Sequence, residues 1–123
     1  MKYNQELAGD IERFKDYVLI VEGKKDVTAL KSLGFDKVYA LHLTGVPLRE
    51  RVEQIMTYVA KKERVCILTD IDRRGKLLYE KVKPIFQELG ARLDSTFRGI
   101  LIKAQISHIE GLSTFMQKVN QIE

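Results

Sequence analysis

The sequence predicts an α/β fold, a Rossmann-like three-layer α/β/α sandwich built on a mainly parallel sheet of about four strands. Short continuous apolar runs recur along the chain, as is typical of strands that are covered on both faces. Each run is followed by a segment with apolar residues at every third or fourth position, the period of an amphipathic helix. This alternation of strand and helix indicates parallel strands joined by helical crossovers on the faces of the sheet.

The first half of the chain supplies two strand–helix pairs. A short amphipathic helix is predicted within residues 1–16, as an N-terminal extension. Residues 17–21 follow as a buried strand and residues 24–33 as a helix. Residues 37–41 are the second predicted strand, and the apolar stripe of the next helix runs over residues 48–59.

The second half repeats the pattern. Residues 65–69 are predicted as a buried strand, and residues 78–89 carry a helical stripe. Pro84 is expected to kink that helix, because proline removes one backbone hydrogen bond. Residues 91–94 read as a short fourth strand, and a closing helix is predicted over residues 112–119. The segment between these two has no clear pattern.

Length and composition indicate a folded protein, and we expect a single domain over residues 1–123. No apolar run approaches the roughly 20 residues that span a bilayer, and the first residues do not resemble a signal peptide. Cys66 is the one cysteine, which excludes an internal disulfide and favours a packed thiol in the cytoplasm. The net charge of +4 weakly favours polyanionic partners.

Acidic side chains follow two of the predicted strands at the point where each strand ends. Glu22 follows the first strand, and Asp70 and Asp72 follow the third. Ligands of parallel sheets bind outside the carboxyl ends of the strands, so we expect these acids to meet there. Asp70 and Asp72 are two residues apart and are expected to point to the same side. Such carboxylates suit Mg²⁺, with Mn²⁺ as an alternative ion. Crowding among the acids raises a carboxyl pKa, which suits Glu22 for proton transfer.

Each acidic motif alone has an ordinary structural explanation, because aspartates after strands often form turns or cap helices. Their occurrence at equivalent ends of alternate strands is what indicates a functional site. A receiver domain of phosphorelays also combines a parallel sheet with a carboxylate Mg²⁺ site, and it is a remote alternative. That domain requires an acidic pair after the first strand, where this chain has Glu22 and Gly23.

The segments VLIVEGKKD (18–26) and ILTDIDRRGK (67–76) together resemble the paired signature of the Toprim superfamily. That superfamily includes topoisomerases, bacterial-type primases, recombination-mediator proteins and ribosomal-RNA maturation nucleases. The resemblance covers most of the chain and implies the Toprim version of the predicted fold. In the family a glutamate transfers protons and two aspartates bind magnesium. The matching residues are Glu22, Asp70 and Asp72, which we take as catalytic, with Glu22 at the edge of the metal site.

The resemblance implies Mg²⁺-dependent processing of a nucleic-acid phosphodiester by a stand-alone, nuclease-like Toprim domain. The chain has no room for the domain that carries a topoisomerase's nucleophilic tyrosine, and it lacks the zinc-binding cysteines of primases. It resembles the Toprim part of the ribosomal-RNA maturation nucleases and primases. The alternative is a non-catalytic Toprim module that binds nucleic acid within a larger DNA- or RNA-processing complex. The sequence does not distinguish DNA from RNA.

Cations beside the two acidic motifs are the expected phosphate contacts, since helix starts favour anions. We call the five nearest ones the basic rim: Lys24, Lys25, Arg73, Arg74 and Lys76. Arg98 is a further candidate clamp for phosphate or carboxylate.

Three other polar positions have weaker interpretations. His108 and Glu110 flank an apolar residue and are weighed as additional metal ligands. His42 alternates with apolar neighbours and is expected to pack in the core. Thr44 is expected to cap the helix that follows it.

Overall fold

The computed structural model describes residue 9, residues 11–109 and residues 111–112. Within them, parallel strands form one sheet in the order β2-β1-β3-β4. The predicted α/β fold with about four parallel strands is confirmed. The strands of the sheet are β1 (Val18–Val21), β2 (Val38–Ala40), β3 (Arg64–Ile67) and β4 (Arg92–Leu93).

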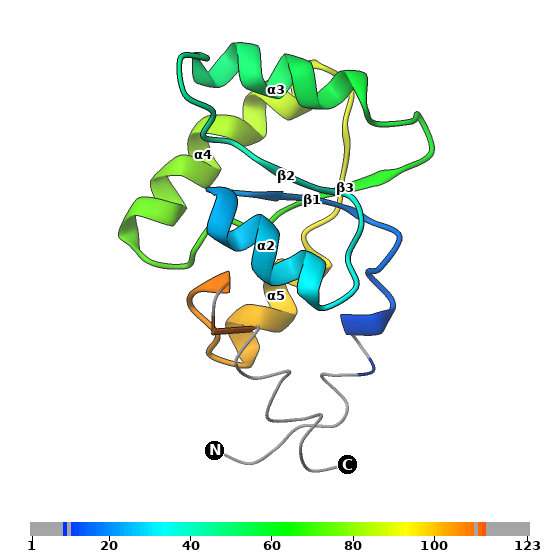
Figure 1. The fold of residues 1–123 in the computed structure, drawn as a ribbon, viewed down its shortest axis with the longest axis vertical. Coiled ribbons are helices and arrows are strands. Elements are labelled where there is room, and N and C mark those ends of the chain that lie inside the picture. The colour runs from blue at the N-terminus through cyan, green and yellow to red at the C-terminus, as the bar shows by residue number, and fades with distance from the viewer. Residues whose placement is uncertain (1–8, 10, 110, 113–123) are drawn as a thin grey trace.

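Helices cover both faces of this sheet. Figure 1 shows α3 and α4 on one side of the strands and α2 and α5 on the other. The three-layer arrangement therefore matches the sequence prediction. The helices are α2 (Lys24–Ser32), α3 (Leu48–Thr57), α4 (Arg73–Glu88) and α5 (Thr96–Lys103). None of the helices in the described ranges is long and apolar enough to cross a membrane.

The central strands have apolar side chains on both faces because successive strand residues point in opposite directions. In β1, Leu19 and Val21 belong to the core under α2 and α5. Val18 and Ile20 belong to the second core, under α3 and α4. Cys66 of β3 is fully buried, and this burial raises the pKa of its thiol to about 12. It is a packed core residue, as predicted.

The third strand ends earlier than its apolar pattern predicted. β3 stops at Ile67, although the Leu68 amide still donates to the carbonyl of Ile20 at 2.7 Å. The carbonyl of Thr69 accepts a hydrogen bond from the side chain of Arg98. The chain has left the sheet at that point, which frees the next residues to form a loop.

The helices differ from expectation mainly at their ends. α4 begins at Arg73, one turn before the predicted apolar stripe, and runs through the exposed Pro84 to Glu88. The segment without a clear pattern contains α5. Most of the predicted opening helix lies outside the described residues, although residues 11 and 12 are helical. The predicted closing helix also lies outside them, apart from residue 112.

Candidate metal centre and nucleic-acid interface

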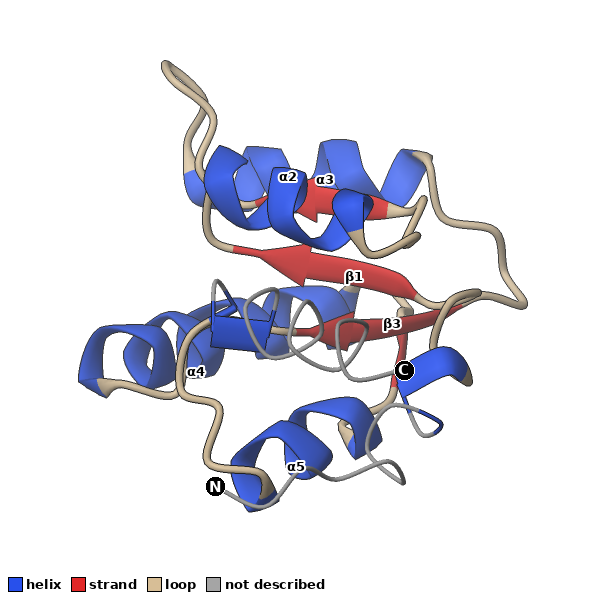
Figure 2. Ribbon diagram, turned by 60° about the horizontal axis from the view of Figure 1, so that its bottom comes forward, coloured by secondary structure: helices blue, strands red, loops and turns tan. Residues whose placement is uncertain are grey.

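The two acidic loops meet at the carboxyl edge of the sheet, because β1 and β3 are neighbours in it. Figure 2 shows these two strands side by side. Glu22 follows β1 directly, and its Oε1 accepts a hydrogen bond from the backbone N–H of Asp70 at 3.2 Å. The structure therefore brings together two of the acids that the sequence selected, although 48 positions separate them along the chain.

The loop after β3 is held in place by the segment that follows α5. The N–H of Ile71 donates to the carbonyl of Ser107 at 2.7 Å, and the side chain of Ile71 packs against the core. The Oδ1 of Asp70 accepts from the N–H of Ile109 at 3.2 Å. These contacts turn the carboxyl groups on either side of Ile71 towards the surface.

Asp70, Asp72 and His108 form a group that can hold a metal ion. One carboxylate oxygen from each aspartate and one ring nitrogen of the histidine all lie within 4.8 Å of one another. Asp70 is half-buried, whereas Asp72 and His108 are exposed. The pair of carboxylate oxygens fits Mg²⁺ and also suits Mn²⁺, which prefers carboxylate ligands as well.

Asp72 caps a helix and also belongs to the candidate metal group. Its Oδ1 accepts from the N–H of Gly75 at 2.8 Å, which caps the start of α4. Its Oδ2 lies 3.4 Å from Nε2 of His108. The hydrogen bond from Gly75 is the main cause of the lowered pKa of Asp72, and the His108 ring adds to it. Asp72 therefore stays ionised to a lower pH than an ordinary aspartate.

Glu22 has the opposite electrostatic character. Partial burial is the main cause of the raised pKa of its carboxyl group. The negative charges of Asp70, Asp26 and Asp72 raise that pKa further, against the hydrogen bond from the Asp70 amide. A glutamate in this environment exchanges a proton closer to neutral pH than a solvated one does, which suits general acid–base chemistry.

Gly75 determines the shape of the Asp70 loop. A Cβ atom at this position would lie 1.8 Å from the carbonyl oxygen of Asp70, far inside van der Waals contact. The loop is closed further by the hydroxyl of Thr69, which donates to the carbonyl of Gly75 at 2.7 Å. Only a glycine allows the start of α4 to approach the Asp70 loop so closely.

The cations fall into two groups. All five members of the basic rim are exposed, in the first turns of α2 and α4. Arg98 instead is 7% exposed. Its Nη1 donates to the carbonyl of Thr69 at 2.5 Å, and its guanidinium carbon lies 4.4 Å from the ring centre of Tyr79. Arg98 thus lies beneath the Asp70 loop and supports it, rather than joining the surface rim.

Three weaker sequence interpretations have different outcomes. His108 lies beside both aspartates, whereas Glu110 lies outside the described residues. His42 is exposed, so the prediction that it packs in the core is wrong. β2 ends at Ala40, and the chain turns outward after the buried Leu41. Thr44 does not cap the next helix, because Pro47 occupies that position.

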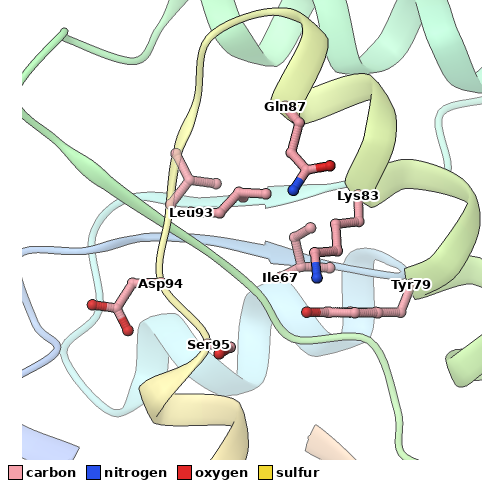
Figure 3. A pocket seen from close by; sticks show the side chains of 8 residues that line it. Ile67, Tyr79, Lys83, Gln87, Leu93, Asp94 and Ser95 are labelled. Carbon is pink, nitrogen blue, oxygen red and sulfur yellow. The ribbon is translucent and has the colours of Figure 1, made fainter.

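A pocket of about 240 Å³ lies between α4 and β4. We call it the β4 pocket. Figure 3 shows Tyr79, Lys83 and Gln87 reaching from α4 towards Leu93 and Ser95. Its floor is apolar, and its polar lining residues are Tyr79, Lys83, Gln87, Asp94 and Ser95.

Comparison with known proteins identifies the family. Residues 17–110 match the Toprim domain family. The chain belongs to this family. The match contains both acidic loops, and membership connects this Toprim domain with nucleic-acid transactions. Toprim domains typically bind Mg²⁺, in agreement with the carboxylate pair at the sheet edge.

The similarity between this Toprim domain and its relatives extends over most of the chain. A UPF0292 protein from Methanosarcina barkeri is 30% identical over 94% of this chain and 81% of its own length. A UPF0292 protein from Methanocaldococcus jannaschii is 28% identical over 95% of this chain and 94% of its own. A solved structure of a protein from Aquifex aeolicus matches with a TM-score of 0.70 and 28% identity. That match covers 89% of this chain and 98% of the other.

Proposed function

We propose that this Toprim domain cleaves nucleic-acid phosphodiesters with Mg²⁺ or Mn²⁺ as its cofactor. The observation that carries the proposal is the meeting of Glu22, Asp70 and Asp72 from two loops at one edge of the sheet. An acidic centre alone would repel a polyanion. A centre that binds a cation and is bordered by exposed lysines and arginines would attract one.

Asp70 and Asp72 are the proposed metal ligands, with His108 as a third candidate. Their donor atoms already lie close together, and the contacts of the loop with Ser107 and Ile109 hold them there. Preorganisation of this kind lowers the free-energy cost of gathering like charges. A divalent cation bound here would supply a Lewis acid for a phosphoryl oxygen.

Glu22 is the proposed proton-transfer residue. Its carboxylate is oriented by the backbone N–H of Asp70, and its pKa is raised mainly by burial. A raised pKa favours a carboxyl group that takes a proton from the attacking oxygen or gives one to the departing oxygen. In this arrangement Glu22 lies at the edge of the metal site and acts on the reacting oxygen.

The basic rim is the proposed phosphate-binding surface, through Lys24, Lys25, Arg73, Arg74 and Lys76. The logarithm of the binding constant should then fall linearly with the logarithm of the salt concentration, with a slope of roughly 0.7 to 0.9 for each phosphate contact. Arg98 contributes by holding the carbonyl of Thr69, so its proposed role is positioning of the Asp70 loop.

The test incubates the pure protein with labelled single-stranded, duplex and structured RNA and DNA, with Mg²⁺ or Mn²⁺. Glu22→Gln keeps the size of the side chain and removes the titratable group. Asp70→Asn combined with Asp72→Asn removes the charges that bind metal. We expect metal-dependent cleavage that both variants lose. Equal cleavage by all three proteins would identify a contaminant.

The same assay decides between the enzyme and a non-catalytic module. The basic rim would serve equally in a domain that only binds nucleic acid within a larger DNA- or RNA-processing complex. Tight, salt-dependent binding without cleavage of any substrate would establish the module instead.

A further inference from the structure

A groove starts at the acidic centre and runs along one side of α4. Its first part has a volume of about 380 Å³ and is lined by Glu22, His42, Arg74, Leu77, Leu78 and Lys81. Its second part, of about 420 Å³, shares His42, Leu78 and Lys81 with the first and continues to Leu43 and Thr44. We call the two parts together the α4 groove. It begins at the proposed proton-transfer residue, Glu22, and leads to the loop after β2, which contributes Leu43 and Thr44.

The charged side chains of the groove match a phosphate backbone. Arg74 and Lys81 are seven residues apart on α4, which places them on one face and about 10 Å apart along the axis. Arg74 is exposed at the start of the helix. Lys81 makes no hydrogen bond or ion pair with any residue in the described ranges. Its charge is therefore available to a ligand.

The apolar side chains of the groove match bases that are not paired. Leu77 is 59% exposed and Leu43 is 41% exposed, which makes them two of the four exposed large hydrophobic residues in the described part of the chain. Both line the groove: Leu77 lies between Arg74 and Lys81 along α4, and Leu43 lies in the second part, which also contains Lys81. A duplex hides its base faces and presents mainly phosphates to a groove. A single strand also offers bases that pack on apolar side chains.

We propose that the α4 groove holds a single-stranded segment of the nucleic acid, with phosphates on Arg74 and Lys81 and bases against Leu43 and Leu77. The inference rests on the proposed function and deepens it by naming the substrate as single-stranded at the site of reaction. It also assigns the strand a path, from Glu22 along α4 to the loop after β2.

The β4 pocket, on the other side of α4, fits a nucleic-acid strand less well than the α4 groove does. Lys83 shares that pocket with the carboxylate of Asp94, so the formal charges of its lining cancel. It shares no lining residue with the α4 groove and does not include Glu22. Figure 3 shows Lys83 directed into this pocket. Lys81 and Lys83, two residues apart on one helix, thus serve different cavities.

That pair of lysines supplies a matched experiment. Lys81→Glu and Lys83→Glu make the same change of charge on the two sides of α4. Binding is measured by fluorescence anisotropy with a single strand of about 12 nucleotides, within the range that such grooves accommodate, and with a hairpin duplex. Both are measured in Mg²⁺, in a Glu22→Gln background that prevents cleavage. Circular dichroism melts check that each variant folds.

We expect the single strand to bind more tightly than the duplex. Lys81→Glu should weaken single-strand binding about tenfold and lower the salt slope by roughly 0.7 for the lost phosphate contact. Lys83→Glu should change the affinity less than about twofold, because its pocket lies off the path of the strand. Equal losses in the two variants, no loss in Lys81→Glu, or preference for the duplex would overturn the proposal.

The contribution of the bases is measured with an abasic strand. Leu77→Asn should weaken binding of the normal strand several-fold and leave binding of the abasic strand unchanged. An equal effect on both strands would show that Leu77 does not contact bases, and would contradict the proposed placement.

A cleavage assay separates failure of the groove from failure of the proposed function. If Lys81→Glu weakens single-strand binding while the wild type cleaves nothing, the groove is supported and the nuclease is rejected. If the wild type cleaves and Glu22→Gln does not, but Lys81→Glu binds and cleaves normally, the nuclease is supported and the groove is rejected.

Discussion

The two acidic loops look alike in the sequence and differ in construction. Each follows a buried strand and contains an acid, a glycine and adjacent cations. Gly23 in the first loop has extended backbone angles, and a Cβ added to it would meet no atom within 4 Å, whereas a Cβ on Gly75 would collide with Asp70. The first loop is an open turn into a helix. The second is closed tightly around the candidate metal ligands.

The difference follows from what each loop must hold. The first loop presents one carboxylate, Glu22, which is oriented by a single hydrogen bond from the Asp70 amide. The second presents two carboxylates side by side, which repel each other unless a cation lies between them. It is braced by the side chain of Arg98 and by the backbone N–H of Ile109. Rigidity is concentrated where like charges are held together.

The largest expected effect comes from substituting the two glycines in turn. Gly75→Ala should destabilise the domain by about 3 kcal/mol, because the backbone of the Asp70 loop must move to admit the methyl group. Gly23→Ala should change the free energy of unfolding by less than about 1 kcal/mol. Urea unfolding of both variants measures the contrast. Similar losses in the two would contradict the difference between the loops.

The internal brace of the second loop is the next test. Arg98→Met keeps the bulk of the side chain and removes the donor to the buried carbonyl of Thr69, at an expected cost of about 2 kcal/mol. Arg92→Met, at an exposed arginine of β4, is the matched control and should have little effect. Mn²⁺ titration should also detect weaker metal binding in Arg98→Met alone. Unchanged stability would exclude Arg98 as a support of the loop.

A further acid near the same sheet, Asp94, provides a purely structural comparison. Asp94 follows β4 and accepts hydrogen bonds from Thr96 and Arg64 at 2.8 and 2.9 Å. The bonds from Thr96, followed by those from Arg64 and Tyr17, lower the pKa of Asp94 to about 2. The ionised carboxylate of Asp94 therefore stabilises the folded state fully above its unfolded-state pKa near 3.8. This stabilisation is lost as the pH falls through about 2.

Asp94→Asn should therefore destabilise the domain by about 1 to 2 kcal/mol near neutral pH. The difference in the free energy of unfolding between variant and wild type should narrow below about pH 4 and close near about pH 2, following the two pKa values of Asp94. Urea unfolding at a series of pH values measures it, and metal binding should not change. A gap that is constant with pH would show that the charge of Asp94 contributes nothing.

The smallest effect on stability is expected at the two aspartates that bond to the loop glycines. Asp72→Asn keeps an N-cap side chain, so the urea midpoint of unfolding should barely change. Its affinity for Mn²⁺ should nevertheless fall at least about tenfold, because a charged ligand is lost. Asp26→Asn makes the same change beside Gly23 in the first loop.

Calorimetric titration with Mn²⁺ should find binding by Asp26→Asn within about twofold of the wild type, since Asp26 is no ligand of the proposed site. Equal losses in the two aspartate variants would mean that general negative charge, rather than coordination by Asp72, attracts the ion.

Much of the fold and half of the site could be predicted because they depend on local pattern. The apolar runs of β1 and β3 have the signature of doubly covered strands, and both strands are buried apart from the first residue of β3. The rule that ligands bind at the carboxyl ends of parallel strands then brought Glu22 and Asp70 to one edge. The identity of the central acids needed only strand order and strand direction.

The positions that sequence reasoning misplaced or supported only weakly depend on distant contacts. His42 continues an alternating pattern, yet the turn after Leu41 exposes it in the α4 groove. Arg98 looked like a surface clamp, but packing against Tyr79 and Thr69 places it in the interior. His108 had no spacing that tied it to Asp72, because 36 residues separate them.

The sequence by itself determined the layers of the fold, the edge of the sheet where the acidic loops meet and the three acids in those loops. The period of apolar residues and the position of a strand end can both be read from a short segment of sequence. Burial of apolar surface then drives each segment into the helix or strand that its period predicts. Only the tertiary structure decided that His108 joins Asp70 and Asp72, that Arg98 lies beneath them and that a groove leads away from Glu22. Those relations arise where segments far apart in the chain pack together, and side-chain contacts of that kind leave no period in the sequence.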